Sequence, residues 1–305
     1  MKVRYSYLSQ QFDNSEDLWE KLKIFVKSGD FTLGKELQKF EEGFAKLIGT
    51  KYAIGVNSGT DAIKLSLKAF DVKPGDEVIT AANTFVATVG AINEIGAVPV
   101  FVDCNDTFCM DTNLIEEKIS KKTKAILPVH FTGYMTDMRK LNEIAQKHNL
   151  VVIEDACQSI LGAIDGKNAG QWGNAGAFSL HPLKNLNVWS DGGIIVTDSS
   201  ELFKKLSLLR NHGLSDRDNV QILGYNSRLD TFQAVVGNWL LPKAKSISDQ
   251  RIKNANYLDN NLKKINGISI PPRPEDFRIV YHLYIIFADK RDLLLEYCIK
   301  KGIEA

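Results

Sequence analysis

The sequence predicts an α/β protein built on a mainly parallel, seven-stranded sheet. Two observations lead to this fold class. The chain has 305 residues, enough for one large α/β domain and a smaller partner. Short β-rich runs also alternate with helical patterns, as in a sheet covered on both faces. We expect the large domain over residues 1–240 and the start of a smaller, incomplete C-terminal α/β domain over 241–305.

The first clear element is a helix over residues 34–48, where Leu37, Phe40 and Phe44 recur at helical spacing. The strands that follow are expected at residues 52–56, 77–80, 98–102, 125–129, 151–154, 175–180 and 193–197. Helices are expected between most of them, at residues 61–70, 88–95, 112–119 and 138–148. No helical pattern separates the last two strands, which allows one of them to run antiparallel.

A long helical pattern over residues 229–262 follows, and we place the domain change within it, near Leu241. A Pro-rich connector at 271–277 then leads to an expected strand at 279–289 and a helix at 291–301. The sequence stops at KKGIEA, where a further strand would begin. We therefore expect a C-terminal truncation.

Composition narrows the possible functions. The formal net charge is +1, which gives no electrostatic reason to expect nucleic acid or an anionic membrane as a partner. The sequence has no bilayer-length apolar run and no signal-peptide core, so we expect a cytoplasmic protein. The four cysteines form no CxxC pair and no zinc-like spacing. They are expected as free thiols, and no metal site is expected.

Three candidate sites follow expected strands, at the sheet edge where open α/β proteins bind ligands. The first is Ser58-Gly59-Thr60, at the start of a predicted helix. The amides of Gly59 and Thr60 would favour an anion there. The alternative is a simple helix cap, with Ser58 or Thr60 as the capping residue.

The other two candidates are an acid and a lysine. Asp155 follows the apolar run 151–153, and an acid partly buried there needs a cationic partner unless it only caps a helix. Lys184 follows a strand and the rigid Pro182 turn. It is either a solvated loop charge or a lysine that forms a Schiff base with an aldehyde.

Together the three sites match what pyridoxal phosphate (PLP) requires. A phosphate cradle, an acid beside a pyridine nitrogen and an amine for the aldehyde would meet at one edge of the sheet. Other cofactor motifs are missing, since the sequence contains no GxxxxGK[ST], no GxGxxG and no HExxH.

The order of several sequence blocks resembles a known family. The blocks include NSGTDAI, PGDEVITAANTFVAT, EDACQS, AFSLHPLKNL, SDGGIIVT and GYNSRLDTFQA. They are similar to sugar aminotransferases of the DegT/DnrJ/StrS type, fold-type I PLP enzymes whose large domain is like that of aspartate aminotransferase. The resemblance implies a PLP-dependent transfer of an amino group, with glutamate as donor, to a keto or aldehyde sugar used for cell-surface polysaccharide or lipopolysaccharide.

The resemblance also implies roles for individual residues. Lys184 and Asp155 would be catalytic, the first through the Schiff base and the second by pairing with the ring nitrogen. Asn226 would reach the phosphate of a neighbouring subunit's cofactor, which implies a homodimer with shared active sites. The residues implied to bind the cofactor are Ser58, Gly59, Thr60, Phe85, Asp155, Gln158, Ser179, Lys184 and Asn226.

The chain departs from the family pattern in three places, of which the first two bear on the substrate and the third on completeness and activity. His181-Pro182-Leu183 replaces the usual tyrosine-containing turn, residues 129–133 read VHFTG instead of VHLYG, and the C-terminal substrate segment is absent. The stretch SLHPLKNLNVWSDGG is similar to enzymes that install the 8-amino group of 8-amino-3,8-dideoxy-octulosonate. The alternatives are a PLP-dependent sugar dehydratase, whose branch carries His in place of the lysine, and a non-catalytic regulatory or fragment member.

Overall fold

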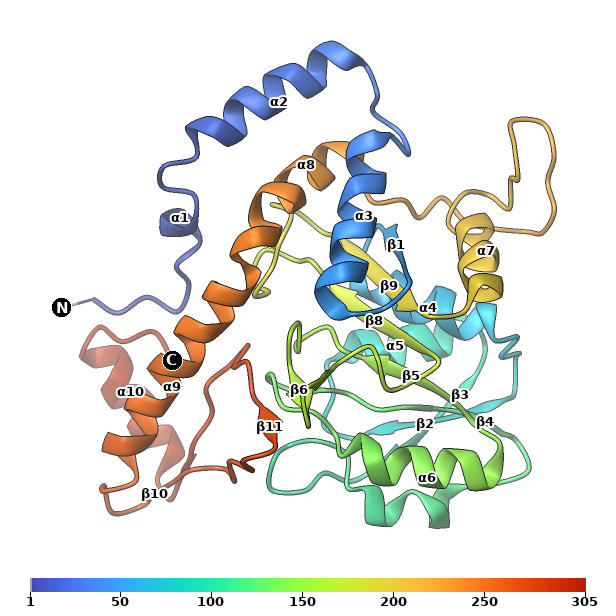
Figure 1. The fold of residues 1–305 in the computed structure, drawn as a ribbon. Coiled ribbons are helices and arrows are strands. Elements are labelled where there is room, and N and C mark those ends of the chain that lie inside the picture. Colours follow the sequence, from blue (N-terminus) through green and yellow to red (C-terminus); the bar gives the residue numbers. More distant parts are fainter. Residues whose placement is uncertain (1) are drawn as a thin grey trace.

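The computed structural model describes residues 2–305 and centres on a seven-stranded sheet (Figure 1). Its strand order is β1-β9-β8-β5-β4-β2-β3. The strands are β1 (Tyr52–Val56), β2 (Glu77–Ala81), β3 (Val98–Val102), β4 (Thr123–Leu127), β5 (Val151–Asp155), β8 (Ala175–Ser179) and β9 (Gly193–Thr197). All seven expected strands are therefore present, and the α/β fold class is confirmed.

Strand direction also follows the expectation. The pairs within β3, β2, β4, β5 and β8 are parallel, whereas β9 is antiparallel to both β1 and β8. Because β9 runs the other way, its first residue, Gly193, lies opposite Ser179, the last residue of β8. The connection between them, which carries Lys184, therefore leaves and re-enters the sheet at the same edge.

Alternating side chains divide the core into two layers, one on each face of the sheet. Ile54 and Leu127 belong to the layer beneath α4 (Gly59–Ala69), α5 (Val86–Glu94) and α7 (Ser200–Leu209). Ala53 and Ile126 belong to the layer beneath α3 (Lys35–Ile48), α6 (Met138–His148) and α8 (Thr231–Leu240). Burial on both faces holds the strand ends in fixed positions.

Helices α1 (Leu8–Gln11), α2 (Glu16–Ser28) and α7 lie outside the expected set. Helix α2 packs against α8 and extends away from the sheet at the top of Figure 1. The expected helix at 34–48 is α3, and those at 61–70, 88–95 and 138–148 are α4, α5 and α6. No helix in residues 2–305 is long and apolar enough to cross a membrane.

The C-terminal part begins with a broken helical stretch. The 3₁₀ turn η3 (Leu241–Lys243), which contains Pro242, separates α8 from α9 (Ala244–Leu262). Beyond α9 lie β10 (Ile268–Ser269), β11 (Phe277–Arg278), β12 (Phe287–Ala288) and α10 (Arg291–Lys300). β11 pairs with β6 (Ala163–Ile164), which also pairs with β7 (Lys167–Asn168). The domain boundary near Leu241 stays a prediction.

Two expected elements are wrong. The helix expected at 112–119 is two 3₁₀ turns, η1 (Thr112–Leu114) and η2 (Glu116–Lys118), closed by short-range bonds such as Lys118 N to Ile115 O. The strand expected at 279–289 is mostly an irregular strap. Its Val280 and Leu283 amides donate to the carbonyls of Gly133 and Thr132, and Tyr281 has a φ of 48°, which interrupts a strand.

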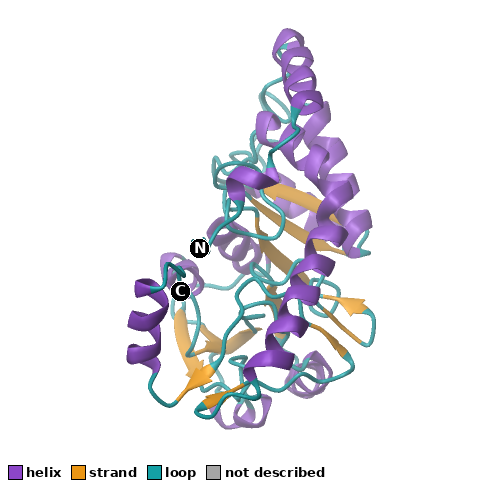
Figure 2. Ribbon diagram, turned by 90° about the vertical axis from the view of Figure 1, so that its left-hand side faces the viewer, coloured by secondary structure: helices purple, strands orange, loops and turns teal. Residues whose placement is uncertain are grey.

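The two ends of the described chain lie together, as Figure 2 shows. Val3 forms a parallel bridge with Ile303, and the Glu304 amide donates to the Val3 carbonyl at 2.9 Å. The Tyr5 amide donates to the Glu304 carboxylate. This contact brings the N-terminal segment alongside the strap at 280–284, where both line one cavity beside Lys184.

Candidate active site

A cavity of about 460 Å³ opens at the carboxyl ends of the parallel strands. Eight of the nine residues expected to bind the cofactor line it, namely Ser58, Gly59, Thr60, Phe85, Asp155, Gln158, Ser179 and Lys184. They come from segments as far apart in sequence as β1 and the loop after β8. The sheet edge therefore gathers these residues into one site.

The start of α4 forms an anion-binding end of this cavity. Ser58 is the N-cap, and its hydroxyl accepts from the Asp61 amide at 3.1 Å. Within residues 2–305 the amides of Gly59 and Thr60 donate to no acceptor. The cap and the anion site are thus compatible, because capping occupies one amide and leaves two for a phosphate.

Position 59 has room only for a glycine, because neighbouring atoms occupy the space that a side chain would need. A Cβ at this position would lie 2.8 Å from Ser179 Cβ and 2.9 Å from Cys157 Sγ. Ser179 is buried at the end of β8 and lines the same cavity. Its hydroxyl is therefore close to the start of α4, where it could add a donor to the two free amides.

Asp155 ends β5, where side chains and backbone hold its carboxylate. Thr88, in the first turn of α5, donates its hydroxyl to Oδ2 at 2.7 Å, and the Cys157 amide donates to Oδ1 at 3.2 Å. Thr84 contacts the Thr88 hydroxyl at 2.8 Å. Because no helix begins at Asp155, the helix-cap alternative is wrong. The carboxylate is available to pair with a cation in the cavity.

Lys184 lies in the loop between β8 and β9. The Lys184 amide donates to the His181 carbonyl, and the loop is closed at its base by Leu180 N to Gly192 O at 2.8 Å. Burial lowers the pKa of the Lys184 amine, while Cys157 and Asp155 oppose that shift. The solvated-loop alternative does not fit, because this lysine lines two cavities and is largely withdrawn from water. A lowered pKa favours a nucleophilic, neutral amine.

Gln158 and Phe85 lie on different walls. The Gln158 carbonyl oxygen accepts from the Thr132 amide at 2.7 Å, which leaves its NH₂ group to donate elsewhere. Phe85 precedes α5 and is 65% exposed, so its ring is available to a planar ligand in the cavity. Both arrangements suit an aromatic cofactor carrying a hydroxyl.

Asn226 is separated from the other predicted residues. It lines a second hollow, with Asn57, Asp191, Arg228 and Phe232. Asp191 lines both this hollow and the main cavity. Within one chain, Asn226 therefore does not join the cofactor cavity, and its role between subunits stays a prediction.

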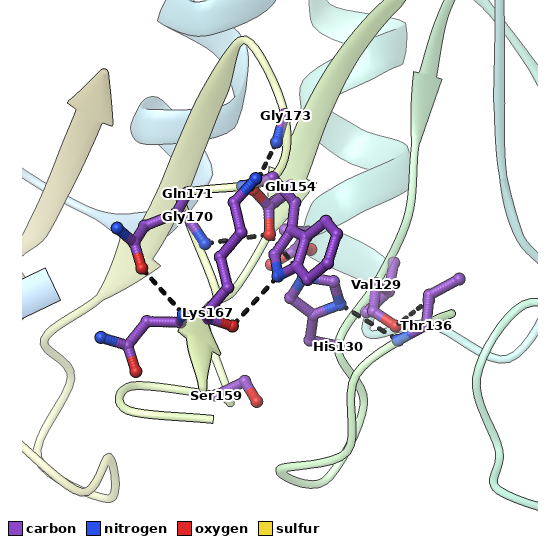
Figure 3. A network of polar contacts seen from close by, with 12 residues as sticks. Val129, His130, Thr136, Glu154, Ser159, Lys167, Gly170, Gln171 and Gly173 are labelled. Atoms are coloured by element: carbon purple, nitrogen blue, oxygen red, sulfur yellow. Dashed lines mark hydrogen bonds and ion pairs between the residues drawn. The ribbon is translucent and has the colours of Figure 1, made fainter. Parts of the chain in front are cut away.

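A hydrogen-bond network around the fully buried Glu154 and His130 was not anticipated (Figure 3). The Glu154 carboxylate accepts from the amides of Gly170, Trp172 and Gly173 at 2.7–2.9 Å, and from His130 Nε2 at 2.9 Å. The Thr136 amide donates to His130 Nδ1 at 3.3 Å. An amide only donates, so the His130 hydrogen is on Nε2 and points to Glu154.

This network holds the residues of the cofactor cavity from behind. The His130 amide donates to the Asp155 carbonyl at 3.0 Å. The loop of residues 130–136 also supplies the Thr132 amide that orients Gln158. A signal was present in the sequence, because alternation along β5 sends Glu154 and Asp155 to opposite faces.

Two further residues were missed. Cys157 lines the cofactor cavity together with Lys184, and burial raises the pKa of its thiol well above the usual range. His282, on the strap, lines both the main cavity and the cavity beside it. Burial, and then the charge of Lys184, lowers the pKa of His282 to about 3. His282 is therefore neutral at physiological pH.

Comparison with known proteins agrees with this geometry. The model of the DegT/DnrJ/EryC1/StrS aminotransferase family matches residues 13–305. The chain belongs to this family. It is 40% identical to a pleiotropic regulatory protein of Geobacillus stearothermophilus, over 99% of this chain and 82% of the relative. It is 41% identical to a UDP-N-acetyl-3-dehydro-α-D-glucosamine 3-aminotransferase of Acidithiobacillus ferrooxidans, over 88% and 72%.

Solved structures are similar over nearly the whole chain. S. venezuelae DesV, in complex with a ketimine intermediate, matches with a TM-score of 0.97 and 35% identity, covering 99% of this chain and 82% of that one. NtdA of Bacillus subtilis, with bound pyridoxamine phosphate, matches with a TM-score of 0.90 and 35% identity, over 99% and 71%. The chain is an aminotransferase whose relatives include sugar transaminases, and its cofactor is PLP.

The side chains of the cavity fit this cofactor. The two free amides of α4 and the Ser179 hydroxyl suit a phosphate, Asp155 suits a protonated ring nitrogen, and Lys184 suits an aldehyde. Gly59 leaves the space that a Cβ would fill.

Proposed function

We propose that this protein moves an amino group from glutamate to a keto or aldehyde sugar, for cell-surface polysaccharide or lipopolysaccharide. The supporting observation is the meeting of Lys184, Asp155 and the free amides of Gly59 and Thr60 in one cavity. The relatives include a sugar transaminase, which supports a sugar as the acceptor of the amino group. A cytoplasmic location belongs to the same proposal.

Residues of this chain would divide the work. Bound PLP supplies an aldehyde that captures amines and a ring that takes up electrons. Burial lowers the pKa of Lys184 and so favours its neutral amine. Its Nζ would take the proton from the donor's α-carbon and pass it to the cofactor carbon that carries the aldehyde. Asp155, held by Thr88, keeps the ring nitrogen protonated. Two half-reactions on one site predict ping-pong kinetics.

A spectroscopic experiment tests the cofactor assignment. The PLP-loaded protein should absorb in the visible, and borohydride should fix the cofactor to the wild-type chain but not to Lys184→Ala. Asp155→Asn should retain the cofactor and lose most turnover. If borohydride fixes no cofactor to the wild-type protein, the assignment of Lys184 is wrong.

A second experiment tests the reaction. Glutamate should convert the bound PLP to pyridoxamine phosphate, and a panel of keto and aldehyde sugars should then return it to PLP with amino-sugar formation. Sugar dehydration without net amino transfer would support the dehydratase instead. Lys184 argues against that branch, in which His replaces the lysine. An enzyme of the octulosonate type would accept only the corresponding eight-carbon aldehyde sugar.

We further propose a homodimer with shared sites. Support comes from the place of Asn226, outside its own chain's cofactor cavity. Exposed aromatic side chains of the same region, Phe232 and Trp19, also favour burial against a second copy. Mixing Lys184→Ala with Asn226→Ala subunits tests this, because each mixed dimer would contain one intact site. Random reassortment predicts about a quarter of wild-type activity, and no recovery would refute the sharing.

A further inference from the structure

The strap at 280–284 lies beside the loop that carries Lys184. Its residues His282 and Leu283 line both the cofactor cavity and a second cavity, of about 610 Å³, that adjoins it. Lys184 lines the same two cavities. The strap belongs to the C-terminal part of the chain, and the lysine loop belongs to the seven-stranded sheet. A contact between the two therefore joins the C-terminal part to the lysine.

The backbone of the strap is held on two sides. The Val280 amide donates to the Gly133 carbonyl at 3.1 Å. Arg251 Nη1, on α9, donates to the Tyr281 carbonyl at 3.0 Å. A Cβ at position 133 would clash with the Tyr281 amide nitrogen, so the strap packs closely against this loop. The strap is therefore a fixed point to which a side chain of the lysine loop can be anchored.

Asn185, the residue after Lys184, makes that contact. Its Nδ2 donates to the Val280 carbonyl at 3.0 Å. Only 4% of Asn185 is exposed, and its buried Oδ1 has no partner within residues 2–305. The amide satisfies one buried carbonyl but leaves its own oxygen unpaired, so its net contribution to stability is small. Stability alone is a poor reason for an asparagine at this position.

We propose that Asn185 is a positioning residue, which fixes the direction from which the Lys184 amine reaches an aldehyde in the cofactor cavity. This inference rests on the proposed Schiff base at Lys184. One planar peptide joins the two residues, so anchoring the Asn185 side chain on the strap restricts the backbone of Lys184. An amine must approach a carbonyl from a narrow range of directions, and this restriction therefore speeds the capture of the aldehyde.

The assay compares two forms of the cofactor. PLP forms a covalent bond with the lysine, whereas pyridoxamine phosphate has no aldehyde and occupies the cavity without that bond. We expect Asn185→Leu to slow the capture of PLP by the cofactor-free chain about tenfold or more, because small misplacements of a reacting group cost factors of this order. Stopped-flow visible absorbance measures this rate. The affinity for pyridoxamine phosphate should equal that of the wild type, whereas a purely structural role would alter both readouts.

The lysine loop offers a matched control. Asn187 is fully buried and its Nδ2 donates to Gln11 Oε1, in α1, at 2.9 Å. Asn187→Leu thus removes a bond of the same kind but keeps the link to the strap, and PLP capture should stay near the wild-type rate. In a Lys184→Ala background, Asn185→Leu should leave PLP affinity unchanged. Asn185→Ala leaves room for a water at the Val280 carbonyl, so it tests the link should Asn185→Leu fail to fold.

Each contrary result has a distinct meaning. Wild-type capture rates in Asn185→Leu, or in Asn185→Ala if the first variant does not fold, would overturn the proposal. So would equal losses in PLP capture and pyridoxamine phosphate affinity, or an equal slowing by Asn187→Leu. If borohydride fixes PLP to the wild type but Asn185→Leu captures it normally, Lys184 keeps its role and this inference alone fails. If borohydride fixes no PLP to the wild type, both fail.

Discussion

Replacing Glu154 by Gln should remove a large part of the stability of the fold. The carboxylate accepts four hydrogen bonds, two on each oxygen: Trp172 N and Gly173 N on Oε1, and Gly170 N and His130 Nε2 on Oε2. Gln retains one oxygen and places an NH₂ group against two donors. The Thr136 amide prevents His130 from moving its hydrogen to Nδ1, so the network cannot adapt.

The expected cost follows from this count. Two buried donors lose their acceptor, at about 1–3 kcal/mol each, which gives about 2–6 kcal/mol. Typical domains have only about 5–15 kcal/mol of net stability, so the shift in the urea midpoint of the cofactor-free protein should be large. Glu143→Gln is the matched control, since Glu143 is exposed and its change should stay within about 0.5 kcal/mol. Equal midpoints for the two variants would show that the Glu154 network does not stabilise the fold.

Three further predictions concern the cofactor cavity. Thr88→Val removes the 2.7 Å bond to Asp155, and loss of a bond to a charged group predicts a fall in kcat of about 10- to 100-fold at saturating PLP; an unchanged kcat would contradict the role of Thr88. Gly59→Ala places a Cβ 2.8 Å from Ser179 Cβ, so PLP affinity, measured by absorbance titration, should fall at least about tenfold, and an unaltered affinity would argue against the cradle. Because burial lowers the pKa of Lys184, the rate at which the cofactor-free protein recaptures PLP should rise with pH and level off below about 10.4, the ordinary lysine value; a midpoint at or above it would refute the desolvated amine.

The sequence predicted which residues follow the strand ends, but it did not predict the side-chain contacts that hold those residues in place. Periodicity placed Gly59, Asp155 and Lys184 after strands, and parallel strands bring their carboxyl ends to one edge, so these residues meet. Thr88 escaped notice because a threonine early in a helix carries no sign of a partner 67 positions away. Such pairing depends on how α5 lies over the sheet, which local pattern does not encode.

The wrong elements have the same origin. Residues 279–289 have the composition of a strand, yet Val280 and Leu283 bind the backbone of Thr132 and Gly133. That tertiary contact overrides β-propensity and turns the segment into a strap. It also brings His282 to the edge of the site, nearly 100 residues in sequence from Lys184. Long-range contacts of this kind decide the second cavity, and a single sequence does not reveal them.

The antiparallel direction of β9 closes the lysine loop at its base, so that its two ends lie side by side at one edge of the sheet. Leu180 N to Gly192 O and Val188 N to Leu180 O join the two ends of the loop at its base, so its length can change without moving either strand. The sequence of residues 181–183 can therefore vary while Lys184 keeps its position at the sheet edge. Grafting this loop between family members is a route to exchanging substrate preference as a unit.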